Sequence, residues 1–398
     1  MKKLNYLILS AVIFFMISES CKAIPAFARK YNMSCQTCHL PVPRLKPYGD
    51  DFAGNGFRLS DKPATRFFVE TGDEELSLIR DFPLAARFDA HVTLNYANSK
   101  KSDFGVPFIL KLLSGGELSD KISYYFYFYL SERGELVGVE DCYLQYNDLF
   151  GIDLDIYFGQ FQVSDPLYKR ELRLTLEDYQ VYKVKPGLSQ MNLAYDRGLM
   201  FTYGTDFGTD IIFEIVNGCG LTEADANKIF DIDKHKTLVG RVSQDIGKFL
   251  RVGGFVLTGK EDLFNNAASK AINDVLVYGL DATVGLNDIA ELNMQYLQRN
   301  DGNLLLTGAD INPSKDIATK GAMAELILTP KGDKSKLFYS ALFNWVDSDF
   351  KPLNYSTGTM QIGYLLKRNV RLTAEGTYNF SDSDNAFPFF SLGIVTGF

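Results

Sequence analysis

The residues best suited to chemistry form the run Cys35-Gln36-Thr37-Cys38-His39, a C-x-x-C-H motif in a chain with only five cysteines and three histidines. Two thiols at this spacing can each add across a vinyl group of one haem and form thioethers. The adjacent imidazole can then bind the iron. We therefore predict one covalent haem c, attached through Cys35 and Cys38, with His39 as the proximal iron ligand.

Two other uses of the motif are less compatible with its surroundings. A structural zinc site needs a second pair of Cys or His at similar spacing, and the sequence has none. A thioredoxin-like redox motif needs a βαβ setting, for which Pro41, Pro43 and Pro47 leave no room. Haem attachment is the interpretation that we retain.

Residues 1–23 have the pattern of a secretory signal peptide. Two lysines precede an apolar run over 4–17, and residues 21–23 fit a small-x-Ala cleavage site. The apolar run is short for a bilayer span. Lipidation of Cys21 is the alternative, but Ser18 stands where a lipobox has an aliphatic residue. Export agrees with haem attachment, because c-type haem is attached outside the cytoplasm.

The residues around the motif predict a small helical module over 24–60. Pro25 opens a short helix, since its missing N–H costs nothing in a first turn. The prolines after His39 favour an extended chain, and a second helix near Tyr48 should end at Asn55-Gly56. A module of this size can barely bury a haem by itself.

The rest of the chain has the composition of a β-barrel. Aromatic residues make up 14% of the sequence, with 22 Tyr and 31 Phe but one Trp, and no later stretch approaches a membrane-spanning apolar helix. After a linker over 61–81, apolar residues such as Phe88 and Ala90 alternate with Arg87, Asp89 and His91. One face suits lipid and the other a polar interior.

Alternating segments of this kind lie near 82–96, 106–116, 121–131, 137–146, 154–162, 197–204, 209–217, 237–246, 249–259, 275–286, 289–298, 321–329, 336–346, 356–366, 369–380 and 388–398. We therefore predict an all-β fold, a transmembrane antiparallel β-barrel of about 16 strands over 82–398, behind the helical cytochrome module.

The connections predict which way the barrel faces. Those after even-numbered strands are short, whereas those after odd-numbered strands are mostly long, such as 163–196, 219–236, 260–274 and 299–320. Outer-membrane barrels alternate short periplasmic turns with long external loops, so both chain ends and the module should be periplasmic or in the lumen. The last strand ends in Phe398, which is similar to the signal read by the barrel assembly machinery.

The N-terminal pattern resembles the fused monohaem cytochrome–porins of the bacterial outer membrane, whose characterised members are iron(II) oxidases. The matching residues are Pro25, Phe27-Ala28-Arg29, Cys35, Cys38-His39, Pro43, Leu45, Gly49, Phe52 and Gly56-Phe57. The chain departs from the pattern at Tyr48, Asp50 and Ala53, and over the barrel only the architecture is similar.

The resemblance implies electron transfer across the outer membrane, from an extracellular donor such as Fe(II) to a periplasmic c-type cytochrome. An iron(II) oxidase activity would follow from it. Two alternatives stay open. The module could be a plug in a transport porin, or electrons could be exported to an extracellular acceptor.

A distal iron ligand is harder to assign. Strand parity places His91 in the barrel lumen and His235 in an external loop, so His91 is the candidate. A lone lumen histidine is more often a hydrogen-bonded polar residue. Met200 and Met323 share the parity of the lumen residues and are the next candidates.

Two further groups have ordinary explanations that we favour. Tyr125, Tyr127 and Tyr129 could form a lumen row packed against the haem module, but tyrosine also prefers strands. The net charge of −8 argues against nucleic acid and favours cations near acidic loops, although loops favour Asp in any case. The aspartates in predicted external loops are Asp225, Asp231, Asp233, Asp301, Asp310, Asp347, Asp349, Asp382 and Asp384.

Overall fold

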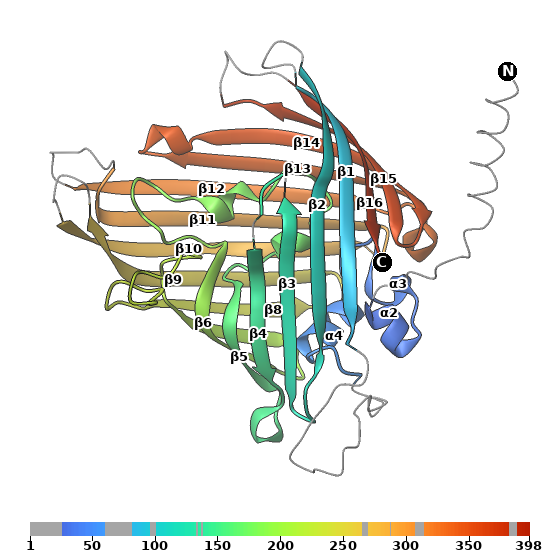
Figure 1. Ribbon diagram of the computed structural model, residues 1–398, viewed down its shortest axis with the longest axis horizontal. Coiled ribbons are helices and arrows are strands. Elements are labelled where there is room, and N and C mark those ends of the chain that lie inside the picture. The colour runs from blue at the N-terminus through green and yellow to red at the C-terminus, as the bar shows by residue number, and fades with distance from the viewer. Residues whose placement is uncertain are drawn as a thin grey trace, which may run out of the picture.

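The chain folds into one closed antiparallel barrel in which each strand pairs with its sequence neighbours and β1 pairs with β16 (Figure 1). The computed structural model describes residues 26–59, 82–95, 101–132, 134–136, 138–264, 270–286, 288–306, 314–381 and 388–398. The predicted all-β barrel of 16 strands is confirmed. The predicted signal peptide and linker lie outside the described residues.

The strands of the first half are β1 Leu84–Asn95, β2 Lys101–Glu117, β3 Ile122–Glu132, β4 Gly138–Tyr146, β5 Leu154–Gln162, β6 Tyr195–Gly204, β7 Thr209–Val216 and β8 Thr237–Ile246. Those of the second half are β9 Leu250–Phe264, β10 Lys270–Leu286, β11 Ala290–Leu304, β12 Lys315–Leu328, β13 Leu337–Ser348, β14 Tyr355–Lys367, β15 Val370–Asn379 and β16 Phe389–Gly397. Each corresponds to one predicted segment.

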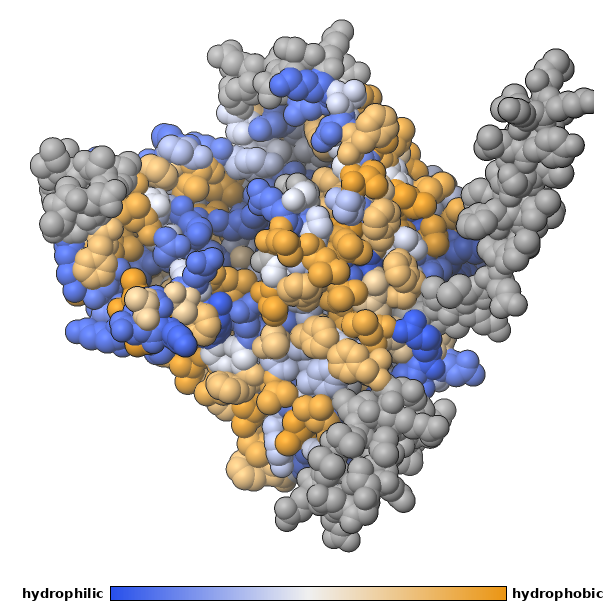
Figure 2. All heavy atoms as spheres, viewed as in Figure 1, coloured by the Kyte–Doolittle hydropathy of each residue, from blue (hydrophilic) through white to orange (hydrophobic). Residues whose placement is uncertain are grey.

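The two faces of the barrel wall follow the predicted parity. Met200 and Met323 are 4% and 2% exposed inside the barrel, whereas Met360 is 76% exposed on the outer face. Apolar residues gather over the outer surface of the wall that faces the viewer in Figure 2. The alternation of apolar and polar residues is therefore what sets the inner and outer faces.

The prediction of two long loops, at 260–274 and 299–320, is wrong, because strands occupy most of both ranges. β9 continues to Phe264 and β10 begins at Lys270, with Lys260 paired to Asp274 at 2.6 Å across the two strands. These strand ends carry polar residues on both faces, so they lack the apolar alternation that marked the other strands. Their backbone hydrogen bonds nevertheless continue the ladder.

The connection over 163–194, between β5 and β6, was also predicted to be external and instead folds into the barrel. We call it the lumen loop. Tyr168 donates to the carbonyl of Ala282 at 2.8 Å, and Tyr179 donates to Glu325 at 2.9 Å. A solvated loop would not bury such residues. Its apolar and aromatic content, including Leu174 and Met191, makes the interior the favourable place for it.

The N-terminal module comprises three short helices, α2 Ala26–Tyr31, α3 Cys35–Cys38 and α4 Pro47–Gly54. The two predicted helices correspond to α2 and α4, while α3 was not predicted. In Figure 1 the module lies at the mouth where the C-terminus lies. Within the described residues, no helix is long and apolar enough to span a membrane.

Candidate haem-attachment site

The two motif cysteines are the first and last residues of α3. The hydroxyl of Ser34 caps this helix by accepting a hydrogen bond from the backbone N–H of Gln36 at 3.4 Å. Side chains three residues apart in a helical turn lie on the same side. Cys35 and Cys38 are therefore arranged so that both can reach one haem edge, and both are free thiols. Burial raises the pKa of each thiol.

The ring of His39 is held by a backbone carbonyl. Its Nδ1 lies 2.9 Å from the oxygen of Pro43. Because a carbonyl oxygen only accepts, Nδ1 carries the proton and Nε2 keeps the lone pair. Burial also lowers the pKa of His39, which favours the neutral ring. Histidines that bind metals show this arrangement, in which the second nitrogen donates to a carbonyl or carboxylate.

The side-chain groups at this site and the tautomer of His39 fit a covalent haem. Two free thiols and a neutral imidazole with an available Nε2 are the groups that c-type attachment uses. Neither of the two cavities described below is lined by Cys35, Cys38 or His39. The fit therefore rests on chemistry and orientation rather than on a preformed cavity.

Helix α4 packs closely on α3 because of Gly49. A Cβ at this position would lie closer to the carbonyl oxygen of Cys38 than van der Waals contact allows. That same oxygen accepts the backbone N–H of Lys46 at 2.8 Å. The glycine thus permits a contact that fixes the C-terminal end of α3 and, with it, the position of His39.

Aromatic rings join the module to the barrel wall. Phe27 stacks on Phe57 at 4.5 Å between centroids, and Phe57 stacks on Tyr125 of β3 at 5.3 Å. Tyr127 and Tyr129 belong to the same buried cluster. The tyrosine row therefore does pack against the module. The preference of tyrosine for strands, which we favoured as the explanation of this row, is incomplete.

Three ion pairs hold the module at separate points around the mouth. Lys46 pairs with Asp333 at 2.9 Å, and Arg58 pairs with Asp148 at 3.0 Å. Arg44 pairs with Glu291 of β11. Asp148 and Asp333 belong to the short turns after β4 and β12, so the module lies at the mouth formed by the short turns.

The structure places His91 on the lumen face, as predicted, with 3% of its surface exposed. Its Nδ1 lies 3.2 Å from the hydroxyl of Ser391, and its ring packs edge-on against Phe108 at 4.9 Å. No hydrogen bond, ion pair or ring contact found in the described chain joins His91 to residues 35–39. Its role as a distal ligand stays a prediction. His235 lies in the connection between β7 and β8, also as predicted.

The aspartates of the predicted external loops mostly serve the protein itself. Asp225 accepts the backbone N–H groups of Asn227 and Ile229, and Asp231 pairs with Lys236. Asp301 is not in a loop but in β11, where it is buried. Among the residues that the structure describes, no group of three or more His, Cys, Asp or Glu is placed to hold a metal ion. Asp310, Asp382 and Asp384 lie outside those residues.

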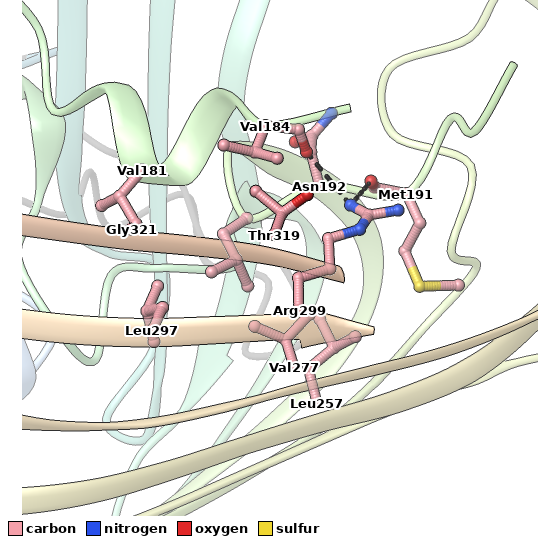
Figure 3. Close-up of a pocket in the computed structure, with 11 residues that line it drawn as sticks. Val181, Val184, Met191, Asn192, Leu257, Val277, Leu297, Arg299, Thr319 and Gly321 are labelled. Carbon is pink, nitrogen blue, oxygen red and sulfur yellow. Dashed lines mark hydrogen bonds between the residues drawn. The ribbon is translucent and has the colours of Figure 1, made fainter. Parts of the chain in front are cut away.

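Arg299 of β11 fixes the lumen loop to the wall, and sequence analysis did not identify it. It donates to the carbonyl of Met191 at 2.6 Å (Figure 3). It also donates to the hydroxyl of Ser189 at 2.7 Å, while Asp301 balances its charge. A mostly apolar cavity of about 20 Å³ lies beside it, lined by Val181 and other residues of the loop and wall. This is room for about one water.

Solved structures confirm the architecture. The chain is similar to the Vibrio cholerae outer membrane protein OmpT with loop L8 deleted (TM-score 0.54, 13% identity, 80% of this chain and 99% of that chain). It is similar to an anion-selective porin from Comamonas acidovorans (0.55, 13%, 80% and 99%) and to the channel DcaP of Acinetobacter baumannii (0.53, 13%, 80% and 97%). No family model and no curated protein matches the chain. The fold is porin-like.

Proposed function

We propose that this chain is an outer-membrane protein that carries one covalent c-type haem and transfers electrons across that membrane. The porin-like barrel with its apolar outer face supports the membrane assignment. The short-turn mouth, where the module lies, is then periplasmic, and the connections after odd-numbered strands lead to the external side or, for the lumen loop, into the barrel.

The hydrogen bond between His39 and the carbonyl of Pro43 is the observation that supports this proposal most. It prepares Nε2 to bind iron next to two free thiols in one helical turn. The bound haem would supply one-electron Fe(II)/Fe(III) chemistry. The chain itself holds the group through Cys35, Cys38 and His39, and Gly49 keeps the supporting helix in place.

The position of the module supports transfer across the barrel. Its aromatic contacts with β3 and its ion pairs at three points hold it in the mouth in a defined orientation. We infer that the donor is extracellular, with Fe(II) as the substrate implied by the resemblance, and that a periplasmic c-type cytochrome is the acceptor. A single haem passes one electron at a time, which suits this couple. Ferric product is insoluble near neutral pH, which gives a reason to form it outside the cell.

Two measurements on the purified holoprotein test this proposal. A pyridine haemochrome assay with intact mass should give one covalent haem per chain, and Cys38→Ala should fail to mature. Anaerobic Fe(II) titration should then reduce the haem spectrum, and an oxidised periplasmic cytochrome should restore it. A non-covalent haem, or two haems per chain, would contradict the assignment of one attachment site. A haem that stays oxidised when Fe(II) is added would contradict the assignment of Fe(II) as the electron donor.

A transport role is the second candidate, and the lumen loop is the observation that favours it. Residues 163–194 enter the lumen and contact β10, β12, β14 and β15, so the loop fills part of the barrel interior. The module would then be a plug. Single-channel conductance in a planar bilayer, with no response of the haem to Fe(II), would favour this function. Reduction only by a periplasmic donor would favour electron export.

A further inference from the structure

A second cavity, of about 30 Å³, lies between the lumen loop and strands β1, β2, β3, β14, β15 and β16. Its lining is rich in charged side chains, with the basic residues outnumbering the acidic ones. The basic residues are Arg87, Lys111, Arg173 and Arg371, and the acidic ones are Asp89, Glu132 and Glu171. With histidine neutral, the lining residues carry an excess of one positive charge, and one of the cations, Arg173, also pairs with Asp178 outside the lining at 3.7 Å.

Arg371 is the first of two cations here that form no ion pair in the described part of the chain. It is 4% exposed, and no carboxylate of the described chain lies within ion-pair distance of it. One of its terminal nitrogens donates to the carbonyl of Val42 at 3.1 Å, but its Nε has no hydrogen-bond partner among the described residues. The Nε of Arg173, across the same cavity, also has none there. Two N–H donors are therefore left unsatisfied beside one space.

Lys111 is the second such cation. It is also 4% exposed, and its Nζ lies 4.0 Å from the centroid of the Tyr127 ring and 5.3 Å from that of Tyr129. In the described part of the chain, no ion pair or hydrogen bond is found for its ammonium group. A ring face offsets only part of the cost of removing an ammonium ion from water.

Other buried cations of the barrel wall are paired. Away from this cavity, Arg241 meets Asp281 at 2.5 Å and Arg299 meets Asp301 at 2.7 Å. The lack of an ion pair at Arg371 and Lys111 therefore distinguishes this cavity from these other parts of the lumen. Because an unpaired buried charge is costly, a further negative group should lie near Arg371 and Lys111.

We propose that this cavity binds one small monovalent anion of about the size of chloride. The anion would neutralise the excess charge and accept from the Nε groups of Arg173 and Arg371 and from the Nζ of Lys111. The cavity has room for about one or two waters, so a larger anion would not enter fully. Water could satisfy the donors, but it could not balance the charge. The site needs no haem, so it is independent of the proposed function.

Chloride binding to the purified holoprotein in detergent tests this site. Chloride is titrated while gluconate, which is too large to enter the cavity, keeps the ionic strength constant. Broadening of the ³⁵Cl NMR line should saturate during this titration. Bromide should compete. Arg371→Met and Lys111→Met should each weaken binding by about tenfold or more, because each removes a charged donor. Both should fold, since neither side chain forms an ion pair in the described part of the chain.

Arg251→Gln is the matched control, since it removes one positive charge from a side chain that is 43% exposed and does not line the cavity. It should bind chloride as the unmodified protein does. Absence of saturable chloride broadening in the unmodified protein would overturn the proposal and mean that water fills the cavity. Equal binding by all three variants would overturn it too, because the anion would then lie elsewhere.

Discussion

The ring of Phe57 stacks on the ring of Tyr125, with 5.3 Å between centroids and 27° between planes. One residue belongs to the N-terminal module and the other to the barrel wall. Tyr125 in turn contacts Tyr143 of β4 at 5.6 Å. A continuous set of rings therefore links the candidate haem module to two strands, in addition to its ion pairs.

Removing the first ring should release the module. We expect Phe57→Ala to weaken docking by about 3 kcal/mol, the usual cost of deleting a buried phenylalanine ring. Limited proteolysis of the folded barrel should then cut within 26–59, while the barrel strands stay protected. Phe128→Leu is the control, because Phe128 occupies the outer face of β3. Protection of the module in Phe57→Ala would show that the ion pairs suffice to hold it.

A substitution at Gly49 should disturb the site itself. The methyl group of Gly49→Ala would collide with the carbonyl of Cys38, and relieving such overpacking costs about 1–3 kcal/mol. We expect less covalent haem per chain and a shifted haem spectrum. Gly54→Ala is a matched control in the same helix, since a Cβ there would meet no atom within 4 Å. Equal haem content in both variants would contradict the role of this contact.

The sequence predicted the barrel well because one physical rule repeats along it. Alternation of apolar and polar residues specified each strand, and it placed His91, Met200 and Met323 inside. The same rule failed where strands leave the apolar belt, as at Lys260 and Asp274, because both faces become polar there. The spacing of the cysteines and His39 indicated haem chemistry, but the hydrogen bond to Pro43 could be seen only in three dimensions.

The lumen loop was missed for a different reason. Its length matched that of an external loop, and only its apolar and aromatic side chains hinted at burial. Its contacts involve strands far away in sequence, such as Glu325 and Gln361, which no local pattern reports. The unpaired cations Lys111 and Arg371 were invisible for the same reason, since pairing depends on how distant strands come together.

Releasing the lumen loop should widen the passage. Arg299→Gln would remove the cation that binds the loop and would leave the buried carboxylate of Asp301 without its charged partner, at a cost of about 3 kcal/mol. We expect larger and noisier single-channel currents in a planar bilayer. Arg251→Gln should leave the currents unchanged, since its side chain has no contact with the loop among the interactions found. Unaltered currents in Arg299→Gln would show that the loop is held by its other contacts.

The membrane topology can be tested with inserted tags. A tag beside Asn227, in the exposed connection between β7 and β8, should be accessible to antibody on whole cells. A tag in the turn at Gly247, between β8 and β9, should become accessible only after the outer membrane is opened. This follows from placing the short-turn mouth in the periplasm. The reverse pattern would invert the barrel.

The distal ligand is the last question that a variant can answer. His91 is the described histidine that faces the lumen, and its Nε2 has no hydrogen-bond partner among the described residues. Arg371, which lines the same cavity, reaches the carbonyl of Val42 in the module, so the cavity adjoins the segment that follows His39. Replacing an axial nitrogen changes both spin state and potential.

We therefore expect His91→Ala to shift the ferric Soret band or the midpoint potential of the haem, while His235→Ala leaves both unchanged. The hydroxyl of Ser391 holds Nδ1 of His91, so Ser391→Ala should give a smaller shift in the same direction if Nε2 is the ligand. An unchanged spectrum and potential in His91→Ala would end the ligand hypothesis. Met200 and Met323, which are also buried in the lumen, would then be the next side chains to replace.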